Sequence, residues 1–153
     1  MFPNNLKIVF ISICLITTLV NGIDDSDCGS TIASVHEVKV SGCEELDLCP
    51  LMRDNVTELE ITFEVDSVVE NMKASAFGDI NDNNLFLPFL NMPQRNACVK
   101  SGLQCPLQPG QIYTYTSLIP VKSYYPLVRS NVKWQLWVGN EMILCVFIPS
   151  VIV

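Results

Sequence analysis

The sequence predicts an all-β protein built as an antiparallel sandwich or barrel, and three observations lead to this fold class. Apolar and polar residues alternate along several short runs, as they do in strands with one face in a core and one in water. Clusters of turn-forming residues separate these runs, and no long amphipathic helix pattern lies between them. Cysteines recur along the chain beyond its N-terminal region, which predicts a disulfide framework in a secreted protein.

The strands follow from these patterns. In residues 58–66 apolar side chains alternate with acids and one threonine, and residues 131–138 show the same alternation. Residues 113–121 are rich in aromatic and β-branched residues, and residues 142–153 are apolar on both faces, as expected of a central strand. Weaker strand patterns lie at residues 35–40 and 73–77, and turn signals lie at residues 41–42, 79–84, 109–110 and 139–140.

Two features of the sequence indicate export from the cell. Lys7 precedes the apolar run of residues 8–20, and Val20 and Gly22 suit a cleavage site, so residues 1–22 are predicted to be a signal peptide. The run is shorter than the roughly 20 residues that a membrane-spanning helix needs. Asn55 begins an Asn-Val-Thr sequon, where we expect a sugar. The expected mature protein is one secreted domain, residues 23–153, with the lysosomal lumen as an alternative destination.

The charge of the chain argues against nucleic-acid binding. Its formal net charge is −7, and loss of Lys7 with the signal peptide makes the mature domain more negative still. Phosphate backbones repel such a surface. The acidity is interpreted as a solvated exterior.

Cys14 falls in the predicted signal peptide, which leaves an even number of cysteines in the mature domain. Six cysteines allow fifteen connectivities, and the sequence does not choose among them. Proximity suggests two local loops and a third bond between the two ends of the domain. A metal site is not expected, because paired Cys-x-x-Cys motifs are missing and His36 is the only histidine. The cysteines of the mature domain are Cys28, Cys43, Cys49, Cys98, Cys105 and Cys145.

The sequence offers no catalytic constellation, so we expect neither an enzyme nor a cofactor. Nothing frames His36 as a member of a triad, and the motifs of serine hydrolases, zinc proteases and phosphate-binding loops are absent. The acids of residues 58–66 lie on the outward face of the predicted strand and are better explained by solvation than as a glycosidase pair. A secreted hydrolase is therefore the weakest of the functional hypotheses.

Several segments together resemble a known family. They include Asp27-Cys28-Gly29-Ser30, the run from Cys98 to Leu107, the Ile-Pro-Val-Lys-Ser-Tyr-Tyr-Pro run of residues 119–126 and the Trp-Gln-Leu of residues 134–136. In order, spacing and cysteine positions they resemble the Niemann–Pick type C sterol-transfer branch of the ML (lipid-recognition) domain family across residues 27–153. Insect and mite members share this pattern. Residues 77–98 fit least well, because Phe77-Gly78 stands where vertebrate members carry His-Gly.

The resemblance implies an immunoglobulin-like β-sandwich of two antiparallel sheets with three disulfides, Cys28–Cys145, Cys43–Cys49 and Cys98–Cys105. It also implies a ligand slot between the sheets. The family's sterol-contacting positions correspond to Phe89, Val121 and Tyr125, with Trp134 as a further wall residue. The weaker lining candidates are Leu59, Ile61, Tyr115 and Pro120. Plain core packing is the alternative reading of all these residues, because a filled core has the same composition.

The implied function is to carry a sterol or a similar apolar lipid, with fatty acids and hydrophobic semiochemicals as alternative ligands. A second hypothesis is an immune module that recognises microbial lipids. We expect a monomer that hands its lipid to a membrane or a receptor. Lys122, Arg129 and Lys133 could dock on an anionic membrane, or they could be ordinary solvated cations.

Overall fold

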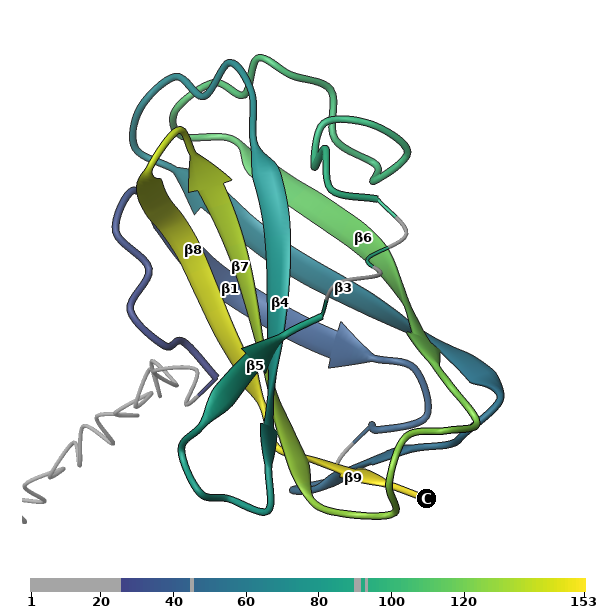
Figure 1. Ribbon diagram of the computed structural model, residues 1–153. Coiled ribbons are helices and arrows are strands. Elements are labelled where there is room, and N and C mark those ends of the chain that lie inside the picture. The colour runs from purple at the N-terminus through teal and green to yellow at the C-terminus, as the bar shows by residue number, and fades with distance from the viewer. Residues whose placement is uncertain (1–25, 45, 90–91, 93) are drawn as a thin grey trace, which may run out of the picture.

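Two antiparallel β-sheets face each other in the computed structural model, which describes residues 26–44, 46–89, 92 and 94–153 (Figure 1). One sheet has the order β1-β3-β6 and the other has the order β5-β4-β7-β8. A small parallel pair, β2-β9, lies at the end of the sandwich near the C-terminus. The predicted signal peptide, residues 1–22, lies outside the described residues. The strands are β1 (Ala33–Val40), β2 (Cys49–Leu51), β3 (Asn55–Val65), β4 (Lys73–Ile80), β5 (Phe86–Pro88), β6 (Ile112–Val121), β7 (Ser130–Val138), β8 (Glu141–Ile148) and β9 (Ser150–Ile152).

The alternating patterns produce the two inner faces, and the all-β class, the sandwich and the presence of three disulfides are confirmed. Along β3 every second side chain from Thr57 to Val65 is buried, and its neighbours Glu58, Glu60 and Glu64 face outward. Along β7 burial alternates in the same way from Ser130 to Leu136. Because the side chains of a strand point to opposite faces in turn, these two runs place the apolar sets of the two sheets against each other.

The composition of the apolar C-terminal run, residues 142–153, predicted one central strand, but the run forms two strands, β8 and β9. It breaks at Pro149, which has no N–H for the ladder, and β8 is the last strand in its sheet. The N-terminal segment runs beside β8 and covers the edge that is not paired with β7 (Figure 1). The backbone N–H of Cys28 donates to the carbonyl of Cys145 at 3.0 Å, and the N–H of Thr31 donates to the carbonyl of Ile143 at 3.1 Å.

β2 and β5 were not predicted, because three residues are too few to show a period. Together with β9 they complete one end of the sandwich. The N–H of Val153 donates to the carbonyl of Leu51 at 3.0 Å, and the N–H of Ile152 donates to the carbonyl of Val128 at 2.9 Å. The C-terminal residues therefore bridge β2 and the segment that leads into β7.

The three disulfides join the pairs that the resemblance implied. Cys28–Cys145 fastens the N-terminal segment to β8 over a sequence separation of 117 residues. Cys43–Cys49 holds β2 against the turn after β1, and Cys98–Cys105 closes a local loop before β6; their separations are 6 and 7 residues.

The long disulfide should contribute most to stability. Replacing Cys28 and Cys145 by serine is expected to lower the free energy of unfolding by about 4–5 kcal/mol, because the crosslink restricts the unfolded chain over the longest loop. Replacing Cys43 and Cys49 in the same way should cost roughly half as much. Urea unfolding of both double variants measures the difference, and equal losses would contradict the loop-length argument.

Candidate functional site

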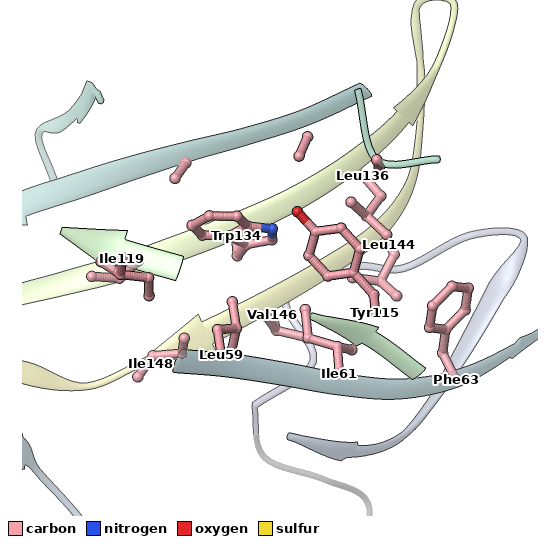
Figure 2. Packing of buried hydrophobic residues seen from close by; sticks show 14 of the residues in the cluster. Leu59, Ile61, Phe63, Tyr115, Ile119, Trp134, Leu136, Leu144, Val146 and Ile148 are labelled. Carbon is pink, nitrogen blue, oxygen red and sulfur yellow. The ribbon is translucent and has the colours of Figure 1, made fainter. Parts of the chain in front are cut away.

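The interior of the sandwich is filled at one end. There β3 and β6 bring apolar side chains against β7 and β8, and the rings of Tyr115 and Trp134 meet across the sheets with centroids 6.3 Å apart (Figure 2). The side chains gathered here are fully buried and interlock at ordinary packing distance. They include Leu59, Ile61, Phe63, Leu136, Leu144 and Val146.

The other end of the interior is hollow. About 530 Å³ of atom-free space, part of it open to solvent, lies between β6 on one sheet and β4 and β7 on the other. Trp134 separates this hollow from the filled end, since it lines the hollow and also contacts Tyr115. The first hollow is lined by Leu51, Ala76, Phe89, Met92, Leu118, Ile119, Pro120, Val121, Tyr125, Ser130, Val132, Trp134 and Ile152.

A second hollow of about 450 Å³ adjoins the first. The two share Phe89, Tyr125, Ser130 and Ile152, so these side chains form the partition between them. The second hollow is more open to solvent and is bounded by the segments around β5 and Pro126. Its position makes it the outer chamber of the same site.

Two aromatic rings stand in the partition. The rings of Phe89 and Tyr125 stack with centroids 6.4 Å apart and an interplanar angle of 22°. The backbone of Phe89 is fixed, because its N–H donates to the carbonyl of Ala76 at 2.8 Å. Tyr125 belongs to a turn in which its N–H donates to the carbonyl of Lys122 at 3.1 Å, and Arg53 Nη1 donates to the Ser123 carbonyl at 3.2 Å. Hydrogen bonds thus position the backbone at both rings, and rotation of the side chains is the simplest way for the rings to separate.

Gly78 makes room for this arrangement. A Cβ atom at this position would lie 3.1 Å from Cζ of Phe89 and 3.2 Å from Oγ of Ser130. Both distances are shorter than nearly all real Cβ contacts. The missing side chain at Gly78 therefore lets the Phe89 ring lie against β4.

The structure divides the residues that the sequence singled out. Phe89, Val121 and Tyr125 line the first hollow, as do Trp134 and Pro120. By contrast, Leu59, Ile61 and Tyr115 are at most 1% exposed and pack within the filled end. They are core residues in this structure, because the contact between Tyr115 and Trp134 closes the interior in front of them.

Other lining residues were not found from the sequence. Leu51 lies on β2 and Ile152 lies on β9, and strands of three residues carry no readable period. Ser130 could have been found, because the inward alternation of Val132, Trp134 and Leu136 extends back to it by two residues.

The site is electrically neutral. No charged side chain lines either hollow in the described part of the chain. The lining residues with polar side-chain groups are Tyr125, Ser130 and Trp134, and the indole N–H of Trp134 is buried and faces Tyr115 (Figure 2). His36 lies elsewhere, on β1, with its Nε2 3.7 Å from a carboxylate oxygen of Glu64. Such a site can hold an apolar molecule by burial, and its lining supplies no base for a nucleophile.

Within the described ranges, no cluster of three or more potential metal ligands exists, and no helix has the length and apolarity to cross a membrane.

Comparisons with known proteins agree with this geometry. The ML domain family matches residues 22–152. This chain belongs to the ML domain family. It is 31% identical to the NPC intracellular cholesterol transporter 2 homolog a of Drosophila melanogaster, over 95% of this chain and 97% of that protein. It is 35% identical to the ecdysteroid-regulated 16 kDa protein of Manduca sexta, over 82% and 85% of the two chains. The crystal structure of a Niemann–Pick type C2 protein from the Japanese carpenter ant superposes with a TM-score of 0.76 at 25% identity, covering 84% of this ML domain chain and 98% of the ant protein.

A side chain at Gly78 should disturb the partition of this ML domain. Gly78→Val is expected to push the Phe89 ring into the hollow and weaken uptake of an apolar fluorescent probe about fivefold or more, as overpacking typically costs about 1–3 kcal/mol. Ala74→Val, on the same strand and inner face but outside both hollows, is the matched control. Equal loss of probe uptake in the two variants would show that overpacking anywhere in β4 has this effect.

Tyr115 should make stability fall at alkaline pH. Burial raises the pKa of its hydroxyl above the usual 10.0, with the side chains of Ser117 and Trp134 opposing the shift. Among the described residues Trp134 Nε1 has no hydrogen bond of normal geometry, so the phenol that faces it (Figure 2) gains little from that contact.

The unfolded chain therefore loses the Tyr115 proton first, and stability drops as the pH rises above about 10. In Tyr115→Phe the drop in unfolding free energy between about pH 8 and pH 11 should be smaller. Tyr124→Phe, at a residue 71% exposed, should keep the drop of the unaltered protein. The same drop in all three proteins would mean that Tyr115 does not contribute.

Proposed function

We propose that this chain binds a sterol or a similar apolar lipid between its two sheets and carries it through an aqueous compartment. The observation that supports this most is the uncharged, apolar hollow behind the stacked rings of Phe89 and Tyr125. Apolar cavities of this kind stay dry and accept apolar guests. The names of the relatives point the same way, since the Drosophila, mouse and bovine proteins are described as cholesterol transporters.

Burial alone supplies enough free energy for this role. A guest that loses about 400 Å² of apolar surface gains roughly 10 kcal/mol at about 25 cal/mol per Å². Loss of translational and rotational freedom cancels much of this gain. Micromolar or tighter binding remains, and a site without charge pairing accepts several apolar shapes.

In the proposed complex Phe89, Val121 and Tyr125 form the walls that contact the lipid, and Trp134 closes the inner end. A lipid that enters from the outer hollow must separate the Phe89 and Tyr125 rings, because these stand between the two spaces. The role is binding without catalysis, since the lining contains hydroxyl groups but no general base.

The setting of this function is also proposed. The chain is exported through its N-terminal signal, acts as a monomer outside the cell or in the lysosomal lumen, and carries a sugar on Asn55. Lys122 and Arg129 flank the segment that holds Tyr125, so these cations and Lys133 would let the mouth dock briefly on an anionic membrane. Arg129 Nε lies 3.4 Å from Asp82, and Lys133 lies 3.8 Å from the centre of the Phe86 ring. Docking would compete with these contacts.

The first test is an inventory of bound lipid. Organic extraction of the natively purified protein followed by mass spectrometry should recover a sterol or a fatty acid. Selective recovery of a bacterial glycolipid would instead favour recognition of microbial lipids, and an empty protein that takes up no added lipid would contradict both.

The second test fills the hollow. Val121 is 3% exposed and lines the first hollow, so Val121→Phe should weaken binding of a fluorescent sterol about fivefold or more by occupying its space. Val138→Phe, half-buried at the far end of β7, is the control and should bind normally. Thermal unfolding of both variants checks that they fold. Unchanged sterol affinity in folded Val121→Phe would remove this hollow from the site.

A further inference from the structure

Ser130 occupies an unusual place in the site. It is the first residue of β7, is 4% exposed and lines both hollows. Among the described residues its hydroxyl makes no hydrogen bond to any other group, and its oxygen is not one of the fully buried side-chain atoms without a partner, so it is reached from the hollows. A hydroxyl placed in this way can bind water while the hollows are empty, and it needs a partner on the guest once a lipid replaces that water.

Other buried serines in this protein do have partners. The Ser150 hydroxyl donates to the carbonyl of Ile148 at 2.9 Å, and the Ser101 hydroxyl donates to the carbonyl of Ala97. Neither residue lines a hollow. Ser130 therefore differs from these two serines in placing a hydroxyl without a protein partner at the partition between the two hollows.

The surroundings of Ser130 leave its hydroxyl facing apolar walls. On one side lies Gly78, where a Cβ atom would come within 3.2 Å of Oγ. The other residues common to both hollows are Phe89, Tyr125 and Ile152. A lipid that spans the two hollows must pass this hydroxyl, so any oxygen that it carries at that depth can pair with it.

We propose that Ser130 is a polar anchor that selects lipids with one neutral oxygen, a hydroxyl or a ketone, at the partition between the hollows. This inference rests on the proposed lipid-carrier function. A serine hydroxyl both donates and accepts, so either group can pair with it. A carboxylate fits poorly at this depth, because the uncharged lining would leave a buried charge without a counter-ion, so a fatty acid would be held with its carboxylate in the solvent-open part of the outer hollow.

The test compares lipids that differ by a single oxygen. Displacement of N-phenyl-1-naphthylamine from the full-length mature protein gives the affinities of cholesterol and cholest-5-ene, and of hexadecanol and hexadecane. Each pair is measured with the unaltered protein, Ser130→Ala and the control Ser150→Ala. For each pair, the affinity of the oxygenated lipid is divided by the affinity of the hydrocarbon. This ratio in the unaltered protein is then compared with the same ratio in Ser130→Ala, so that the different solubilities of the two lipids cancel.

The preference for the oxygenated member of at least one pair should fall about three- to tenfold in Ser130→Ala, the value of one neutral hydrogen bond. Affinity for the hydrocarbon member should be unchanged, and Ser150→Ala should keep the full preference. An undiminished preference in Ser130→Ala would overturn the anchor while leaving the carrier function in place. If no lipid displaces the probe from the unaltered protein, the carrier function itself fails, and the anchor fails with it.

Discussion

The contact between Tyr115 and Trp134 divides the interior of this sandwich, and the remainder of the structure depends on where that division falls. On one side the two sheets interlock as in any filled core, with Leu59, Ile61 and Phe63 fully buried. On the other side the same sheets leave an apolar hollow. Since sheets at normal spacing fill the gap between them, the two rings mark the point at which the filled core ends and the hollow begins.

This division separates stability from function along the length of the strands. The hollow forgoes dispersion contacts that a filled core would make, so the folded state relies on the filled end and on the crosslinks. Cys28–Cys145 acts beside the filled end, and Cys43–Cys49 holds β2, whose Leu51 lines the hollow. One disulfide thus restrains the sheet that stabilises the protein, and another restrains the wall of its site.

Different parts of the molecule were predictable for different reasons. The inner faces of β3 and β7 follow from alternation alone, because burial repeats every second residue. The disulfide pairs and the Phe89, Val121 and Tyr125 positions came from the family resemblance. Periodicity could not distinguish the lining Val121 from the core Ile61, since both are inward apolar residues, and only the spacing of the sheets decides between them. Periodicity also could not place β9. This strand exists because Pro149 ends β8, and it pairs with β2, which is distant in the sequence.

The pairing of the N-terminal segment with β8 has a consequence for biosynthesis. Cys28 and its partner Cys145 are 117 residues apart in the sequence, so Cys28 leaves the ribosome well before Cys145. The free edge of β8 stays uncovered until the two meet, so the sandwich cannot be sealed while translation is in progress. During that interval the Cys28 thiol can react with Cys43 and Cys49, which are translated soon after it, so formation of the native pair depends on the exchange of wrong crosslinks.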